Sequence, residues 1–514
     1  MSVFFSKSLF VILAFLGVLS VCLTPVSAET ELTGPGTLNN VGEYYRLTKD
    51  ISASGTAFTI TADNVTLDLN EHTVTYDTSS GGNGVKISAN RAIVKNGTII
   101  QGNGKSSHSP VVYLSNGSGN ELHHLILKPT GVKCYGISGR RNAEIHHVYI
   151  ESHTTTSCDR GDGIAAIQLE GGSGSGDIHD IHDNILVNGH TGVVLIGGSQ
   201  TTKVYNNLIQ PKRRPGCKAP YGIGLSSKIH NVKVYNNQII SDNGRGIILD
   251  GWYQGAPEGA SGNYIHDNRI DVQYSERATG GYYVENSVYG IRDRYSSGNN
   301  TFENNVIMTA NGVDGRIRAF YVGSDSTDPL MTNILIQNNT IISRALDTSV
   351  PYGAFVFFWD YAQEITCINN NYYTDGTLQR NGNVDDLTFT GNNVLNPIPV
   401  TPIAPTALTI RKFLNSYLLK WNNNFEAGVF EYVVYRDGQK LPISPRGGTF
   451  YVDVDVGGTH TYSISALTLS GTEGPRCAEV STTTAKNGWW REPSGGGEPG
   501  DAPSSPKRLI IIDE

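Results

Sequence analysis

The chain has 514 residues and a formal net charge of −8 at pH 7, from 39 basic and 47 acidic residues. This balance lacks the basic footprint of a nucleic-acid-binding protein, so we expect no nucleic-acid partner. Glycine is abundant, with 59 residues, and only 17% of residues are charged, a composition that suits a turn-rich β protein. The length is enough for two or three domains.

The N-terminal segment has the pattern of a secretory signal. Lys7 precedes an apolar run from Leu9 to Leu23, and the small residues of Val26-Ser27-Ala28 follow. This order of charge, short apolar run and small residues predicts a signal peptide over residues 1–28. A membrane anchor is the weaker alternative, because the run is short for a bilayer span. We therefore expect a secreted, extracellular or periplasmic protein with no membrane span after signal removal.

A six-residue pattern around an asparagine pair recurs along the chain, for example as Val204-Tyr-Asn-Asn-Leu-Ile209. The fourth residues of the copies form a column with steps of 23 to 37 residues: Leu125, Val148, Asn184, Asn207, Asn237, Asn268, Asn305, Asn339 and Asn370, with weaker members at His72, Gly97 and Asn393. A repeat of this length, rich in Val and Ile and without a helical period, predicts a solenoid of β-strands. Coils of 23 residues are too short for propeller blades. Since an amide both donates and accepts, stacked asparagines can form a hydrogen-bonded ladder.

Residues 29–60 precede the clear repeats, and we expect them to form an N-terminal cap over the apolar end of the solenoid. The coils are expected over residues 61–397, beginning with the alternating string Asn64-Val-Thr-Leu-Asp-Leu-Asn-Glu-His-Thr-Val74. This string and the Asn-Asn-x-Ile copies resemble the secreted right-handed parallel β-helix proteins of the pectin-lyase-like group. The resemblance implies an all-β chain with a right-handed parallel β-helix of about twelve coils. One scaffold hosts many chemistries, so the fold alone assigns no activity.

A second pattern follows a proline-rich linker at residues 398–405. Alternating strings and turns occupy residues 406–485, which predict β-strands. The segment resembles a fibronectin type III module through Trp421, Tyr432-Val-Val-Tyr435-Arg-Asp-Gly and Tyr462-Ser-Ile-Ser-Ala. The resemblance implies a small antiparallel β-sandwich. Such modules are usually spacers or contact domains, so residues 406–485 are a candidate surface for cell-surface or protein contacts. Residues 486–514 are too poor in apolar residues to fold and are expected to be a disordered tail.

In the group that the chain resembles, two chemistries act on polysaccharide. A hydrolase needs two carboxylates, whereas a lyase needs a base at the acidic C–H of the sugar and a cation on the uronate carboxylate. The paired aspartates with Gly-His-Gly of pectin hydrolases are missing from this sequence. The acidic calcium cluster of pectate lyases is not recognisable either, so Ca²⁺ stays an open alternative and no cofactor is assigned.

Arginine and aromatic residues are enriched in the later coils. We expect catalytic candidates at Asp250, Arg292, Asp293, Arg294 and Arg318. Substrate-binding candidates around them are Trp252, Tyr253, Tyr283, Arg316, Tyr321, Trp359 and Tyr361, with Tyr289 beside them. Aromatic faces stack on sugar rings, and guanidinium groups pair with carboxylate. Asp250 aligns with Arg294 on the next coil, and the alternative interpretation of this pair is a surface ion pair of small energetic value. Asp293 falls in an inward column, which also fits a buried, hydrogen-bonded carboxylate.

Histidines recur beside the asparagine column, at His123, His124, His146, His147, His179 and His182. We interpret them as stacking residues of the coil corners, and no metal site is predicted.

These features favour a secreted protein that acts on or binds an anionic, uronate-containing polysaccharide, with lyase chemistry ahead of hydrolysis. Arg292, Arg294 and Arg318 would neutralise the carboxylate, and a tyrosine or arginine would take the proton. The alternative is a non-catalytic extracellular surface or adhesion protein that uses the β-helix as a rod for binding glycans or proteins.

Overall fold

The computed structural model describes most of the chain from residue 29 to residue 488. The described ranges are 29–104, 109–131, 135–152, 165–171, 177–197, 201–212, 219–226, 228–242, 244–250, 259–274, 287–294, 296, 298–311, 316–323, 330–345, 353–358, 362–374, 384–395, 401–424, 429–442 and 447–488. The predicted signal peptide and all but the first three residues of the predicted tail lie outside them. Within these ranges no helix is long and apolar enough to cross a membrane.

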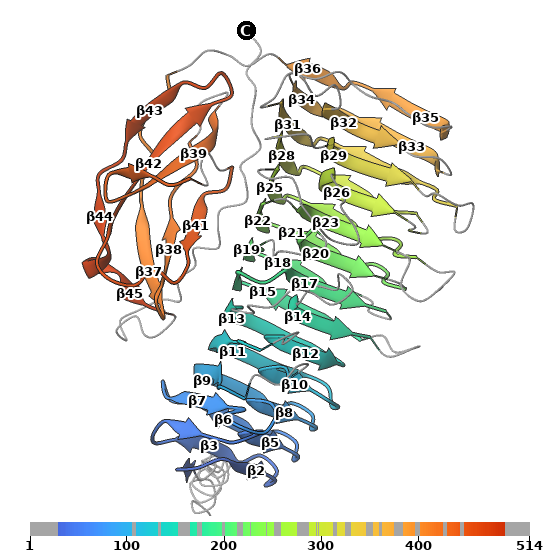
Figure 1. Ribbon diagram of the computed structural model, residues 1–514. Helices are drawn as coiled ribbons and strands as arrows, with labels where there is room; N and C mark the ends of the chain where they lie inside the picture. The colour runs from blue at the N-terminus through green and yellow to red at the C-terminus, as the bar shows by residue number, and fades with distance from the viewer. Residues whose placement is uncertain are drawn as a thin grey trace, which may run out of the picture.

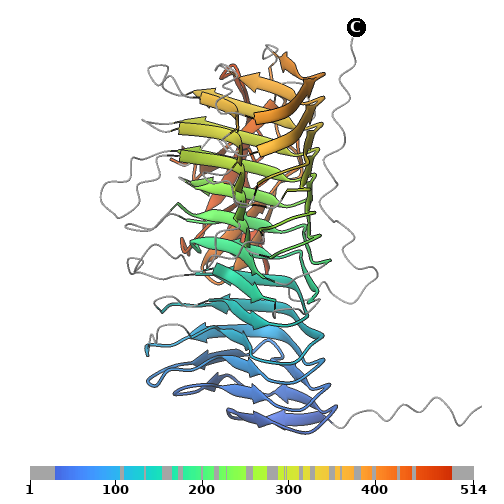
Figure 2. The ribbon, with the colours of Figure 1, turned by 90° about the vertical axis from the view of Figure 1, so that its right-hand side faces the viewer.

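Two parallel sheets wind together into a right-handed β-helix, a rod of stacked coils (Figures 1 and 2). One strand per coil forms a 12-stranded sheet: β2 (Gly36–Leu38), β5 (Phe58–Ile60), β8 (Val85–Ile87), β10 (Val112–Leu114), β12 (Ile137–Arg140), β14 (Ala165–Glu170), β17 (Thr191–Ile196), β20 (Tyr221–Ser226), β23 (Arg245–Asp250), β26 (Ser287–Arg294), β29 (Arg316–Gly323) and β32 (Gly353–Phe358). These twelve strands confirm the predicted number of coils.

The second sheet has 24 strands, because each full coil contributes to it on both sides of a corner. Its strands are β1 (Glu29–Leu32), β3 (Tyr44–Leu47), β4 (Ile51–Ser52), β6 (Thr66–Asp68), β7 (Thr73–Tyr76), β9 (Ile93–Gln101), β11 (Asn120–Lys128), β13 (Ala143–Glu151), β15 (His179–His182), β16 (Ile185–Val187), β18 (Lys203–Tyr205), β19 (Leu208–Gln210), β21 (Lys233–Tyr235), β22 (Gln238–Asp242), β24 (Tyr264–His266), β25 (Arg269–Tyr274), β27 (Thr301–Glu303), β28 (Val306–Asn311), β30 (Ile334–Gln337), β31 (Thr340–Ala345), β33 (Ala362–Ile368), β34 (Asn371–Thr374), β35 (Val384–Thr390) and β36 (Asn393–Leu395).

The coils begin earlier than the sequence indicated. Strand β1 pairs in parallel with β3, and β2 pairs in parallel with β5. Leu38 and Phe58 are buried and continue the apolar stack of the later coils. The expectation of a separate cap over residues 29–60 is therefore corrected: this segment consists of coil strands. The alternation of apolar residues there is broken by short strands and turns, which hid the coil pattern.

Each coil turns its corner through a residue in the left-handed conformation. Asn206, Asn236, Asp267 and Asn304 have φ angles of 57°, 54°, 54° and 54°. Asparagine and aspartate adopt this conformation more readily than other residues with a side chain. They are the third residue of the six-residue pattern, so the recurring asparagine pair combines a corner residue with a ladder residue.

The fourth residue of the pattern forms the predicted ladder inside the coil. The Nδ2 of Asn184 donates to the Oδ1 of Asn207 at 3.0 Å, and Asn207 donates in the same way to Asn237 at 2.9 Å. The chain of amides continues through Asn268, Asn305, Asn339 and Asn370 to Asn392. The predicted column is confirmed except at its end, where Asn392 and not Asn393 joins the ladder.

We predict that Asn268→Ala destabilises the fold by about 2–4 kcal/mol, because four hydrogen-bonding groups inside the coil lose a partner. Asn268 donates to Asn305 and to the carbonyl of Val234, and its Oδ1 accepts from the backbone and side chain of Asn237. Chemical denaturation measures the change. The exposed Asn393→Ala is the control and should cost less than about 0.5 kcal/mol. Equal losses in the two variants would contradict the ladder as the main polar stabiliser of the corner.

The C-terminal module is an antiparallel β-sandwich, as predicted. Its sheets have the orders β41-β38-β37-β45 and β40-β39-β42-β43, with β44 also paired to β42. The elements are β37 (Thr409–Phe413), β38 (Ser416–Lys420), β39 (Val429–Arg436), β40 (Gln439–Lys440), β41 (Phe450–Asp453), β42 (Thr461–Thr468), β43 (Glu473–Arg476), β44 (Val480–Ser481), the 3₁₀ helix η2 (Thr482–Thr484) and β45 (Lys486–Asn487). Trp421, Tyr432 and Tyr462 are buried in its core.

The sandwich packs back along one flank of the β-helix (Figure 1). Phe413 stacks on Tyr149 of β13 with ring centroids 4.4 Å apart. The apolar contact joins outward residues of the coils (Ile126, Tyr149, Ile185, Val187, Leu208, Ile240) to residues of the sandwich (Phe413, Leu418, Phe450, Val452). The module is therefore fixed against the rod and is not extended from it.

Polar groups match across the same interface. The side chain of Gln210 donates to the carbonyl of Val452 at 2.9 Å and accepts from its N–H at 3.0 Å. Glu151, which is fully buried, accepts a hydrogen bond from Ser416 at 2.7 Å, and Lys128 lies 3.3 Å from its other oxygen. Because these buried polar groups have partners, the docked position is specific and not only a hydrophobic contact.

We predict that Phe413→Ala lowers stability by about 3 kcal/mol or more, because it removes a fully buried ring from the docking contact. The denaturation midpoint and protease sensitivity of the sandwich measure the effect. Phe389→Ala, a partly exposed ring on β35, is the control. If Phe413→Ala changes the denaturation midpoint and the protease sensitivity no more than this control does, the docking contact contributes little to stability.

Candidate functional site

The described coils present three outer faces, and they differ in what they can bind. The sandwich covers the face formed by the strands after the corner. The face before the corner carries a column of stacked rings, from His123 and His146 through His182 to Tyr205. The predicted stacking is confirmed for His123, His124, His146, His147 and His182. It is wrong for His179, which is buried beside Ala143 of the previous coil and not in a described ring stack. Because the faces of the stacked rings lie against one another, the stack offers edges and not faces to a sugar.

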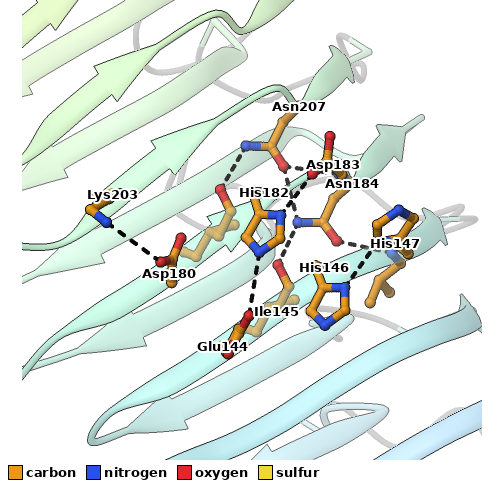
Figure 3. A network of polar contacts seen from close by, with 12 residues as sticks. Glu144, Ile145, His146, His147, Asp180, His182, Asp183, Asn184, Lys203 and Asn207 are labelled. Carbon is orange, nitrogen blue, oxygen red and sulfur yellow. Dashed lines mark hydrogen bonds and ion pairs between the residues drawn. The ribbon is translucent and has the colours of Figure 1, made fainter. Parts of the chain in front are cut away.

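Burial keeps several of these imidazoles neutral. Burial, followed by the neighbouring imidazoles, lowers the pKa of His123 to about 3 and that of His124 to about 4. His182 differs, because Asp183 lies 2.7 Å from its Nδ1 (Figure 3). Although burial opposes it, this hydrogen bond raises the pKa of His182.

The third face, on the 12-stranded sheet, carries the predicted site residues. Parallel register places Arg245 beside Tyr289 and Tyr289 beside Arg318 on β23, β26 and β29. A neighbouring column places Arg292 beside Tyr321. We call these five residues the arginine–tyrosine cluster. Inward positions of the same strands are apolar core residues, such as Ile247, Ile291 and Phe320.

The guanidinium groups of the cluster pack against the two tyrosine rings. Arg318 lies 5.2 Å from the ring centre of Tyr321 and 5.8 Å from that of Tyr289. Arg245 and Arg292 each lie 5.6 Å from the ring of Tyr289, and the two rings meet edge to face at 5.3 Å. Such contacts hold cations in fixed positions. All five side chains are only 4–7% exposed, so the cluster is largely closed to solvent.

Asp250 and Arg294 form a more open rim beside the cluster. They are partners in the register of β23 and β26, which confirms the predicted alignment. Both are of intermediate exposure. Asp250 forms an ion pair with Arg292, at 3.7 Å. The rim therefore connects the buried cations to solvent.

The packing of like charges alters the acid–base properties of the cluster. Burial and the neighbouring Arg292 lower the pKa of Arg245 to about 9, so this arginine gives up its proton more readily than an exposed one. Burial raises the pKa of Tyr321 to about 12, although the nearby arginines act in the opposite direction. Tyr321 is therefore a poor base, which disfavours it as the proton acceptor.

Asp293 is separated from the other predicted catalytic residues. It is fully buried and lies beside Leu249 and Val322, which belong to the coil core. Asn300 donates to its Oδ2 at 3.1 Å. Burial raises the pKa of Asp293 to about 7. This position corresponds to the alternative of a buried carboxylate and does not place Asp293 on the outer face.

Other predicted residues fall outside what the structure describes. Arg316 is the first residue of β29 and pairs with Ser287, but its side chain is not described. The remaining candidates outside the described residues are Trp252, Tyr253, Tyr283, Trp359 and Tyr361. Sequence reasoning missed Arg245. The available signal was its position directly before Gly246, the same place that Tyr289 has before Gly290.

We predict that Asp293→Asn stabilises the protein at pH 8 by on the order of a few kcal/mol and much less at pH 5. The folded-state pKa of Asp293 is raised from its ordinary 3.8 to about 7, so its contribution to stability is fully present below pH 3.8 and is lost as the pH rises to about 7. Asparagine cannot ionise and avoids this loss. Thermal unfolding at the two pH values measures it, with Asp250→Asn as the control on the rim. An equal gain in stability at both pH values would contradict the ionisation of Asp293 as the cause.

No protein-family model and no curated protein matches this chain. Solved structures do match. The Clostridium perfringens spore cortex lytic enzyme SleM is 24% identical over 16% of this chain, with a TM-score of 0.14, and only 27% of that protein is covered. The tailspike protein of E. coli bacteriophage HK620, in complex with a pentasaccharide, is 12% identical over 88% of this chain and 86% of its own, with a TM-score of 0.42. The periplasmic alginate epimerase AlgG is 13% identical over 71% and 84%, with a TM-score of 0.34. At these values the likenesses assign neither substrate nor reaction.

Proposed function

We propose that this protein is a secreted polysaccharide-active β-helix protein whose arginine–tyrosine cluster and rim recognise a uronate-containing chain. The observation that carries the proposal is the convergence of Arg245, Arg292 and Arg318 on two tyrosine rings, with Arg294 at the open edge. Arginine pairs with carboxylate through two parallel hydrogen bonds, and it does so best where water is scarce. A row of carboxylates spaced along a polymer fits a row of arginines along the coils.

Lyase chemistry fits these residues better than hydrolysis. A hydrolase needs two carboxylates on either side of the scissile bond. Among the described outward residues of β23, β26 and β29, Asp250 is the single carboxylate, and Asp293 lies inside the coil. In β-elimination the cations of the cluster would stabilise the carbanion next to the uronate carboxylate. Arg245, with its lowered pKa, would take the proton, a C=C bond would form as the glycosidic C–O bond breaks, and the leaving oxygen would take a proton from water.

A non-catalytic rod that binds anionic glycans is the second candidate. It is favoured by the low exposure of the cluster, which limits direct contact between Arg245 and a polymer. In this case the rim residues Asp250 and Arg294 would make the contact, and the buried arginines would supply a positive field behind them.

We further propose that the C-terminal module belongs to the fibronectin type III class. Its two sheets divide the strands in the manner of that sandwich, with β37, β38 and β41 in one sheet and β39, β40, β42 and β43 in the other. A contact of residues 406–485 with a cell surface or another protein stays a prediction.

We predict that the mature protein forms unsaturated uronate products from alginate, pectate or a glycosaminoglycan. Ultraviolet absorbance of the unsaturated product and a reducing-end assay measure the reaction. Arg245→Gln should reduce kcat/KM by about 100-fold or more if it is the base, and the rate should rise with pH toward 9 as Arg245 loses its proton. Lys233→Ala, an exposed change on another face, is the control.

The outcomes separate the candidates. Reducing ends without unsaturated product would replace the lyase by a hydrolase. No product, together with glycan binding that Arg294→Ala weakens, would establish the binding rod. Unchanged turnover and binding in both Arg294→Ala and Asp250→Ala would remove this face as the site.

A further inference from the structure

The outer face before the corner carries a Glu–His–His group that the proposed polysaccharide site does not use. Glu121 and His123 lie on β11, and His146 lies beside His123 on the next coil. The Nε2 of His146 is 3.2 Å from the Oε1 of Glu121, and the Nε2 of His123 is 3.6 Å from the same oxygen. The three ligand atoms all lie within 4.8 Å of one another. Two neighbouring coils therefore direct three potential metal ligands to one point.

The other nitrogen of each imidazole is already held. The Nδ1 of His123 lies 2.7 Å from the Nδ1 of His124, and the Nδ1 of His146 lies 2.9 Å from that of His147. A hydrogen bond between two nitrogens needs one donor and one acceptor. When the first ring of each pair donates, its Nε2 carries a lone pair directed toward Glu121. His124 and His147 thus provide the outer hydrogen bonds that orient metal-binding imidazoles.

On the next coil, His182 occupies the equivalent position but has no second histidine at its Nδ1. His182 stacks on His146 at 5.0 Å, and its Nε2 is 3.5 Å from Glu144. Its Nδ1 faces Asp183 and not a second histidine (Figure 3). Both nitrogens of this ring lie against carboxylates, so each has an ion-pair partner and no second histidine orients the ring for a metal. The change from histidine to aspartate after the stacked ring thus separates a ligand site from a salt-bridge site.

We propose that Glu121, His123 and His146 bind a divalent transition metal of the Zn²⁺ type and link two adjacent coils. Two imidazoles and one carboxylate are a donor set that zinc uses, with ligand bonds of about 2.0–2.2 Å. Tetrahedral bonds of this length place ligand atoms about 3.3 Å apart. The two Glu–His separations are already near this value, and a tilt of the stacked rings brings the imidazoles together. The side chains are 16–33% exposed, so water completes the coordination.

The test is a titration of the tag-free mature protein with Zn²⁺, by calorimetry or against a zinc indicator. We expect one equivalent to bind and to raise the melting temperature. His123→Gln, His146→Gln and Glu121→Gln should each weaken the affinity at least tenfold. His182→Gln is the matched control, because it changes the same stack with a similar exposure, and it should bind Zn²⁺ as the unchanged protein does.

Three results would overturn the assignment. The first is the absence of stoichiometric Zn²⁺ binding by the unchanged protein, which needs no variant and does not depend on how a variant folds. The second is a His182→Gln variant that loses as much Zn²⁺ affinity as His146→Gln does. The third is unchanged affinity in Glu121→Gln, which preserves the shape of the side chain. Polysaccharide assays do not enter the test, so its outcome is independent of the proposed function.

Discussion

A buried side-chain amide, repeated at the same place in successive coils, is the interaction on which the rest of this structure depends. Each asparagine in the ladder has its donors and acceptor satisfied by its neighbours, so a polar corner can lie inside the rod without cost from unpaired groups. The left-handed residue before it sets the direction of the turn. Because these corners stack in register, residues at equivalent positions line up along the outside as columns.

The columns give the three outer faces distinct characters. After the corner, the outward residues are apolar in many coils, and the sandwich covers them. Before the corner, one column holds the stacked rings from His123 to His266, and the column two residues earlier holds Glu121, Glu144 and Asp180. On the 12-stranded sheet, arginine and tyrosine alternate from coil to coil in the same column. All three faces are formed by the same in-register stacking of coils. The side chains that occupy each column decide whether a face docks the sandwich, is a candidate metal site or is a candidate anion site.

Much of the fold could be predicted because the ladder repeats a short, recognisable string. The neighbouring positions of Asp250 and Arg294 followed from the same alignment. The docking of the sandwich was not predicted, although Tyr149, Ile185 and Leu208 are apolar at outward positions. Apolar residues in a strand do not reveal on their own which face they occupy, and the partner surface lies more than two hundred residues away in sequence. Arg245 was missed for a related reason: it precedes Gly246, and the recurring strand pattern begins at that glycine.

The docked sandwich also constrains how this chain can change in length. In an ordinary solenoid each coil contacts only its neighbours, so a whole coil can be inserted or deleted anywhere along the rod. Here one module contacts coils from Ile126 of β11 to Asp271 of β25, the latter through the N–H of Gly447, and its Leu469 packs on the later cluster of Met308, Ile342 and Tyr373. An added coil within that span would shift every contact beyond it by one strand spacing, about 4.8 Å. Natural variation in coil number should therefore be confined to the N-terminal part of the rod, which the sandwich leaves uncovered.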